Sequence, residues 1–164
     1  NSKIIGKAWS GKYAKKYLPE LYHKKWNNKI HISVGMIAGL PNETEQDFQN
    51  TLDALIKWQK YVATGNIIGI NLGTTATIEV GTEIYNNSSK YNVIPIKGRE
   101  NAQGIYWMCT TTPELDYKER VKRRVLLQEH VVSLGYPIWK GDDHLKIIVD
   151  NYKKDIEVWN AVTN

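Results

Sequence analysis

Residues 30–55, IHISVGMIAGLPNETEQDFQNTLDAL, constrain the fold of this chain more than any other stretch. Residues 30–38 are apolar on both faces apart from His31 and small side chains, which is typical of a parallel strand beneath helices. Pro41 ends this strand, because proline has no amide donor and restricts the residue before it. The sequence therefore predicts a buried strand followed at once by a loop.

The second half of this stretch predicts an amphipathic helix. Thr44 is a favourable N-cap, and Asp47 three residues later completes a capping-box pattern. Glu45 adds negative charge at the positive end of the helix. Four apolar residues recur at helical spacing and are expected to share the buried face: Phe48, Leu52, Leu55 and Ile56.

A second buried strand is predicted for residues 67–72. This segment is mostly apolar, and the Gly65-Asn66 pair before it matches a helix end of the left-handed type. A strand–helix–strand unit within one sheet has parallel strands and a right-handed crossover. Residues 30–72 are therefore expected to form one such unit.

The carboxyl ends of the two predicted strands meet at one edge, and ligands bind at this edge of parallel sheets. Leu72 is expected there together with Gly39 and Leu40. Gly35 and Gly39 leave part of the first strand without side chains, which would let a ligand approach the backbone. Close packing of a helix explains the same glycines equally well. Asn71, the polar residue of the second strand, is either a ligand contact or a buried asparagine bonded to backbone.

The remaining elements follow from periodicity and turn residues. Thr112 and Pro113 predict the start of a long helix that ends near Gly135, and a last helix is expected from Asp142 or Asp143. Both helices are interpreted as packing elements. The other predicted elements are a helix at 13–26, a loop at 73–82, a short helix at 83–89, an edge strand at 93–96 and a strand at 105–110.

The charge of the chain argues against nucleic acid as a partner. The net charge is +5 over 164 residues, but the lysines are scattered. The main basic cluster, residues 118–124, is interrupted by Glu119 and Val121 at helical spacing. The scattered lysines indicate a solvated surface, and a nucleic-acid patch at this cluster is not expected.

The single cysteine, Cys109, excludes an intramolecular disulfide framework and suits a reducing cytosol. We expect it to be a buried structural thiol. No apolar run approaches the roughly 18 residues of a membrane span, and no signal peptide is visible. A cytoplasmic location without a membrane partner is therefore expected.

Other forms of chemistry lack a candidate site. His31, His130 and His144 have no second ligand at a metal-binding interval. Glu43 and Glu79 lie near the predicted ligand edge, but solvated carboxylates are the expected state of both. No catalytic triad or nucleophile elbow is present, so hydrolysis has no candidate residues.

Two segments together resemble a known family. Residues 35–44, GMIAGLPNET, followed by Asp47 and Phe48, resemble the G-x-I-x-G-L-P-x-E-T-x-x-D-F/L signature of radical S-adenosylmethionine (radical SAM) proteins. Residues 80–85, VGTEIY, resemble the P-G-T-x-L/I-Y segment after the sixth strand of that family, with Val80 in place of its proline. The two matches keep the family's order and spacing.

The resemblance implies an α/β fold that is a partial TIM-like barrel. The half-barrel would cover about residues 1–110 of a single domain, and a helical extension would cover about residues 112–164. The first predicted strand would be the fifth of the family's (β/α)6 barrel. The residues implied to line the adenine side of the S-adenosylmethionine pocket are Gly35, Ile37, Gly39, Leu40, Asn71 and Leu72.

The chain departs from the family at its cofactor. Radical SAM chemistry needs three cysteines spaced C-x-x-x-C-x-x-C to hold a four-iron four-sulfur cluster, and this chain has only Cys109. We therefore expect the cluster cysteines upstream of Asn1, so that the chain is the C-terminal half of a larger protein. A degenerate domain that begins at Asn1 is the alternative.

Two functions follow from these expectations. The first is the C-terminal part of a radical SAM enzyme, inactive without the iron–sulfur half, acting on a small-molecule or macromolecular substrate that the resemblance leaves open. The second is a non-catalytic α/β interaction module. Since a cut barrel leaves an unpaired strand edge and an uncovered apolar face, we also expect a homodimer, the missing N-terminal half, or an end helix to cover the sheet.

Overall fold

A computed structural model of the chain describes residues 30–98, 101–138 and 143–163, and for residues 143–149 it describes the backbone alone. The helix expected at 13–26 lies outside the described residues. The described elements, in chain order, are β1 (Ile32–Ala38), α2 (Glu45–Ala63), β2 (Ile67–Thr75), α3 (Glu83–Asn86), the 3₁₀ helix η2 (Ser88–Tyr91), β3 (Val93–Pro95), β4 (Trp107–Cys109), α4 (Tyr117–Ser133) and α5 (Asp143–Thr163).

The first three elements form the predicted strand–helix–strand unit. β1 and β2 are parallel neighbours, with Gly35 opposite Asn71 in the register. The N-cap of α2 is Thr44, and both hydrogen bonds of its capping box with Asp47 are present. The turn after α2 contains Gly65 at φ 75°, the left-handed conformation that the sequence predicts there.

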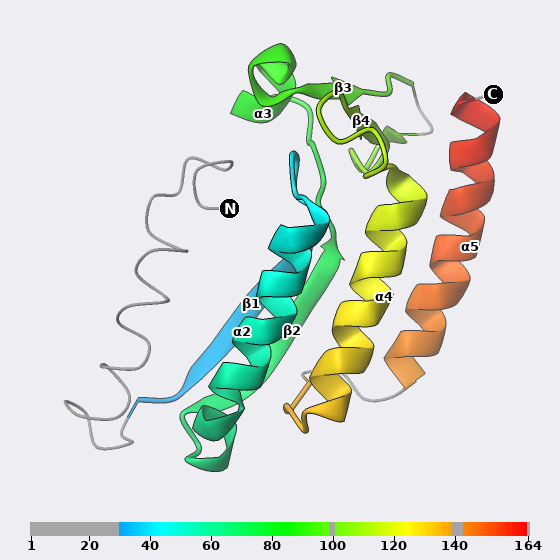
Figure 1. The fold of residues 1–164 in the computed structure, drawn as a ribbon. Coiled ribbons are helices and arrows are strands. Elements are labelled where there is room, and N and C mark those ends of the chain that lie inside the picture. Colours follow the sequence, from blue (N-terminus) through cyan, green and yellow to red (C-terminus); the bar gives the residue numbers. More distant parts are fainter. Residues whose placement is uncertain (1–29, 99–100, 139–142, 164) are drawn as a thin grey trace.

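The helices α2 and α4 pack on the same side of the β1–β2 pair (Figure 1). The side chains that enter this core come from alternate strand positions, among them Val34, Met36, Ile70 and Leu72. The opposite side of the sheet, which we call the bare face, carries exposed residues that no described helix covers: Ser33, Gly35 and Ile37 from β1, and Ile68, Asn71 and Gly73 from β2.

A third segment lies along the second edge of β2. Ile138 forms a parallel bridge with Ile70, and the Ile70 amide donates to the Pro137 carbonyl at 2.8 Å. The described residues therefore form a mixed α/β fold with a small parallel sheet, as expected. They do not form a closed barrel.

A short antiparallel hairpin lies beyond the carboxyl edge of this sheet (Figure 1). Its strands β3 and β4 are shorter than the predicted segments at 93–96 and 105–110. Pro95 is tolerated because β3 has only one partner strand among the described residues. Trp107 of β4 is fully buried and donates its indole N–H to the Ala76 carbonyl at 3.0 Å, which fixes the hairpin to the segment after β2.

The start of α4 differs from the prediction. The helix begins at Tyr117 and not at Thr112-Pro113, because Asp116 is its N-cap and accepts from the Glu119 amide at 2.8 Å. The residues from Thr112 to Leu115 form a separate turn. A smaller error concerns α2, where Ile56 was expected in the core but is 52% exposed.

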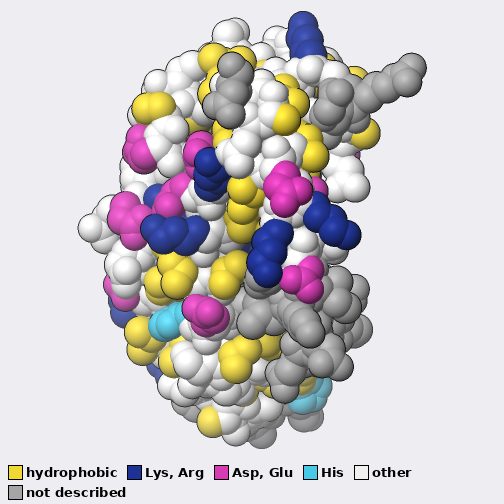
Figure 2. Space-filling model, turned by 90° about the vertical axis from the view of Figure 1, so that its right-hand side faces the viewer, with side chains coloured by type: hydrophobic (Ala, Val, Ile, Leu, Met, Phe, Trp, Pro, Cys, Tyr) yellow, Lys and Arg dark blue, Asp and Glu magenta, His cyan; other side chains and the backbone are white. Residues whose placement is uncertain are grey.

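The last helix, α5, begins at Asp143 as predicted and lies beside α4 (Figure 1). Tyr106, Tyr117 and Trp159 form an aromatic cluster between the hairpin and the two helices, with ring centroids 5.1 to 6.1 Å apart. On the outer face that carries α5, acidic and basic side chains are interspersed (Figure 2). No described helix is long and apolar enough to cross a membrane.

Candidate functional site

A hollow of about 420 Å³ lies at the carboxyl edge of the sheet. Its walls come from the end of β1 with the following loop and from the end of β2 with the segment after it. Thr74, which is exposed, and Thr77, which is half-buried, add polar side chains to an otherwise apolar surface. The residues that line this edge hollow are Ile37, Leu40, Pro41, residues 73–78 and Ile84.

The predicted site residues divide between the two faces of the sheet. Ile37 and Leu40 line the edge hollow. Gly35 and Asn71 lie opposite one another on the bare face, beside the hollow. Because Asn71 is exposed, its alternative as a buried asparagine is wrong. Leu72 lies at the expected edge, but its side chain belongs to the core beneath the helices.

The two glycines of β1 and its loop occupy different surroundings. A Cβ atom built on Gly39 would lie 2.6 Å from Cγ of Arg120, and the residue has φ 73°. Close packing therefore explains Gly39. A Cβ built on Gly35 meets nothing within 4 Å, so packing does not require glycine there.

Glu43 is buried at 5% exposure, which makes the expectation of a solvated carboxylate wrong. Its two carboxylate oxygens accept from the Gly39 amide at 3.1 Å and the Leu40 amide at 3.4 Å. Burial raises the pKa of Glu43, while the hydrogen bond from Arg123 opposes this effect. The carboxylate therefore holds the loop after β1 in its turn. Glu79, by contrast, is exposed as expected.

Arg123 of α4 supports this loop. Its Nη1 atom donates to Glu43 Oε1 at 3.2 Å, and its Nη2 atom donates to Glu45 Oε2 at 3.0 Å. Its Nε atom donates to Glu119 Oε1 at 3.2 Å. One buried guanidinium thus joins α4 to the loop after β1 and to the first turn of α2.

Two further arginines of α4 are buried beside it. Arg124 donates from Nε to the Gly73 carbonyl at 2.5 Å. Arg120 donates to the carbonyls of Trp107 and Ile105 at 2.9 and 2.7 Å, and its guanidinium lies 3.8 Å from the Trp107 ring centroid. Desolvation lowers the pKa of Arg120 to about 9.

The basic cluster at 118–124 is therefore not a continuous basic surface, because its three arginines are buried while Lys118 and Lys122 are exposed. A sequence signal for the burial of its arginines exists. Arg120, Arg123 and Arg124 precede Leu127 and Val131 at helical spacing, and all five residues are buried on one face of α4. The prediction of this helix used only its apolar residues, and these alone do not indicate that the arginines lie on the same face.

Asn42 connects the same loop to the hairpin. It has φ 60°, a conformation that asparagine tolerates better than most residues. Its Oδ1 atom accepts from Thr111 Oγ1 and from Asn92 Nδ2, and its Nδ2 atom donates to the Tyr91 carbonyl. Cys109 is 2% exposed and also donates to Asn42, which confirms the buried thiol.

The chain does not fit an iron–sulfur cluster on its own. It has one cysteine, and no group of three His, Cys, Asp or Glu side chains within residues 30–98, 101–138 and 150–163 is placed to hold a metal ion. The Nδ1 atom of His31 lies 2.7 Å from the Gly65 carbonyl, and the Nε2 atom of His130 lies 3.2 Å from the Leu52 carbonyl. These two histidines therefore have backbone partners.

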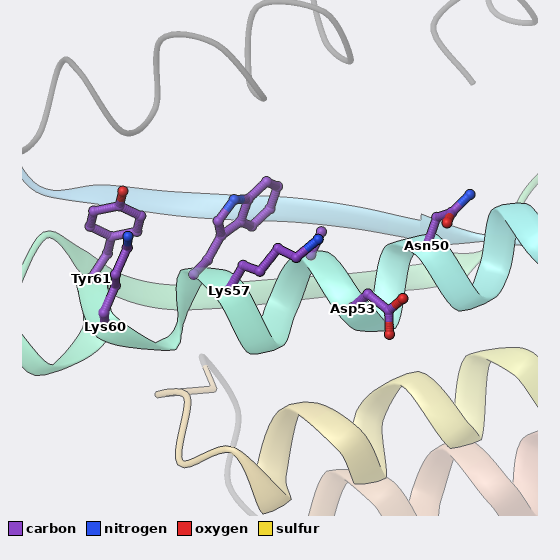
Figure 3. A pocket seen from close by; sticks show the side chains of 7 residues that line it. Asn50, Asp53, Lys57, Lys60 and Tyr61 are labelled. Carbon is purple, nitrogen blue, oxygen red and sulfur yellow. The ribbon is translucent and has the colours of Figure 1, made fainter.

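A second hollow, of about 310 Å³, lies along the flank of α2 (Figure 3). Its side chains come from successive turns of this one helix, and they include Asp53 and Lys57. The polar groups do not converge on a common point in this view. The edge hollow, which is built by several elements, is the better candidate.

Comparisons with known proteins give no assignment. No family model, no curated protein and no solved structure matches this chain.

Proposed function

We propose that the bare face and the edge hollow form the adenine side of an S-adenosylmethionine pocket in a radical SAM enzyme. The enzyme's iron–sulfur cluster would be held by cysteines that this chain does not carry. The chain alone is then expected to bind ligand without turnover. This proposal rests on the resemblance of residues 35–48 and 80–85 to the radical SAM signature.

One structural observation supports it most directly. All described helices that pack on the β1–β2 pair lie on one side, and Gly35, Ile37 and Asn71 lie on the other. In a β/α barrel the helices lie outside, and ligands bind at the carboxyl ends of the strands. The open edge hollow occupies this position.

The residues present suit a purine ring. Ile37 is 54% exposed and offers an apolar contact to one face of the ring. Gly35 adds no side chain to the surface beside it, so a flat group can approach the backbone. The amide of Asn71 supplies both a donor and an acceptor for the ring edge.

Ligand binding by the chain tests the proposal. Adenosine and S-adenosylhomocysteine, each titrated to millimolar concentration, are expected to shift the backbone NMR signals of Gly35, Ile37 and Asn71. The variant Ile37→Glu is expected to lose these shifts. Ile56→Glu is the matched control, because Ile56 is 52% exposed but lies on α2. Absence of shifts in the wild type, or equal binding by Ile37→Glu, would contradict the proposal.

A non-catalytic interaction module is the second candidate, and one observation favours it. Ile37 and Ile68 are 54% and 50% exposed on the bare face, and the outer edge of β1 pairs with no described strand. Such surfaces promote association. A dimer in light scattering that Ile68→Lys converts to monomer, together with no adenosine binding, would favour this module. A monodisperse wild-type monomer would contradict self-association through the bare face.

A further inference from the structure

One face of α4 contacts both walls of the edge hollow. Arg123 reaches the loop after β1 and donates to Glu43 Oε1 at 3.2 Å. Arg124 reaches the end of β2 and donates to the Gly73 carbonyl at 2.5 Å and the Leu72 carbonyl at 3.2 Å. Because adjacent residues of one helix make these contacts, α4 fixes the distance between the walls.

Glu43 extends the contact of Arg123 to the lining of the hollow. The carboxylate accepts from the amides of Gly39 and Leu40, and Leu40 is a lining residue. Arg123 is only 3% exposed, and its Nη1 atom also donates to the Glu43 carbonyl at 3.3 Å. The loop conformation therefore depends on hydrogen bonds whose donor lies on α4.

Arg124 acts on the opposite wall in the same way. It is 1% exposed, and it donates to the Leu72 and Gly73 carbonyls and to the Gln128 amide oxygen. Within the described residues it forms no ion pair. Gly73 lines the hollow directly, so the guanidinium sets the course of the chain at that wall.

Buried charged groups are by themselves weak evidence for a role in core stability. Well-packed apolar side chains of similar volume often stabilise a core as well as or better than buried charged groups. A guanidinium differs from them in its planar fork of donors, which fixes the direction of each acceptor. The contacts of Arg123 and Arg124 are directional in this sense, and their acceptors belong to both walls.

We propose that Arg123 and Arg124 are positioning residues that hold the two walls of the edge hollow at the separation its ligand requires. The pair acts through Glu43 on the first wall and through the Gly73 carbonyl on the second. This inference rests on the proposed function for the nature of the ligand. The positioning itself is measurable without a ligand.

Amide hydrogen exchange tests the first wall. In Arg123→Gln and Glu43→Gln, the amides of Gly39 and Leu40 are expected to exchange faster by about tenfold or more, because opening of the loop becomes easier. Amides in the middle of α2 are expected to keep their rates, as are all amides in the control Lys122→Gln. Arg123→Lys replaces the glutamine variant if that variant does not fold. Unchanged rates at Gly39 and Leu40 would overturn the positioning role of Arg123.

Affinity measurements test the second wall. Arg124→Gln is expected to weaken adenosine binding by roughly tenfold, the order expected when a charged donor is lost from a buried network. Arg124→Lys, which keeps one charged donor, is expected to restore part of the affinity. Val131→Ala is the control, because it lowers stability on the same helix face away from the hollow. Equal loss of affinity in Val131→Ala would overturn the proposal.

The two measurements separate the two possible failures. No adenosine binding by the wild type overturns the proposed function, while faster exchange at Gly39 and Leu40 still supports positioning of the loop. Wild-type binding with unchanged affinity in Arg124→Gln overturns the positioning of the second wall and leaves the proposed function standing.

Discussion

Glycine is present at two positions of β1 and its loop for different physical reasons. Gly39 has φ 73° and packs on the Arg120 side chain, so both its backbone and its surroundings exclude a larger residue. Gly35 has free space around it on the bare face. At the scale of single residues, the same residue type is therefore a packing requirement at one position and an open surface at the other.

Alanine substitutions distinguish these two glycines. Gly39→Ala is expected to lower the free energy of unfolding by about 2–4 kcal/mol, because a left-handed conformation and an overpacked contact both add cost. Gly35→Ala is expected to raise it by about 0.5 kcal/mol by restricting the unfolded chain. Urea denaturation measures both values. Equal losses for the two variants would contradict the environments described.

The buried carboxylate of Glu43 predicts a pH dependence of stability. Burial raises its pKa above the ordinary value of 4.5, so the folded state binds its proton more tightly than the unfolded state. This contribution to stability is complete below pH 4.5 and is lost as the pH rises through the folded-state pKa. The free energy of unfolding of the wild type should therefore fall over this window relative to Glu43→Gln. The free energy of unfolding is measured by urea denaturation at several pH values. A difference between the two proteins that stays constant with pH would refute this.

At the scale of elements, α4 has a more varied role than its apolar pattern indicates. Its first half buries three arginines that bind backbone groups of the β1 loop, β2 and β4. Its second half contributes Leu127 and Val131 to the apolar core beneath the sheet. The helix is thus a packing element at one end and a hydrogen-bonding element at the other.

The N-terminus of α4 can be tested by its cap. Asp116→Ala is expected to cost about 1 kcal/mol, since the Glu119 amide loses its acceptor. Thr112→Val is expected to change stability by less than about 0.5 kcal/mol or to raise it, because the buried Thr112 hydroxyl has no hydrogen-bond partner of good geometry among the described residues. Thermal unfolding followed by circular dichroism compares the two. A larger loss in Thr112→Val would place the functional cap at the earlier position.

At the scale of the whole molecule, α4 joins two of the three apolar cores among the described residues. One core lies between the sheet and the helices α2 and α4, and the second contains the aromatic side chains between the hairpin, α4 and α5. Tyr117 lies in the second core and donates to the Asp155 carboxylate of α5 at 3.1 Å. The position of α5 therefore depends on aromatic packing.

Removal of one ring tests the attachment of α5. Trp159→Ala is expected to lower the free energy of unfolding by about 3–5 kcal/mol, because Trp159 is 4% exposed and its cavity cannot collapse fully. Lys154→Ala on the exposed side of α5 is expected to change it by less than about 0.5 kcal/mol. Chemical denaturation checks both. Similar small effects would indicate that α5 contributes little to the folded state.

Local patterns were sufficient to predict the strand–helix–strand unit. The capping box of Thr44 and Asp47, the left-handed turn at Gly65 and the alternation in β1 each depend on residues a few positions apart. The same reasoning placed Leu40 at the edge that the structure opens to solvent, while Ile37 was implied there only by the family resemblance. It failed for Thr112-Pro113, because a nearby aspartate caps the helix instead.

The sequence by itself therefore determined the strands, the caps and the parallel edge, since short-range hydrogen bonds and periodicity specify them. The tertiary structure decided which charged residues are buried. Glu43 and Arg123 are 80 positions apart in the sequence. The residues next to each of them do not indicate that the two side chains will form a hydrogen bond. Only the folded chain brings them together, because the free energy of burying a charge depends on partners that sequence spacing does not reveal.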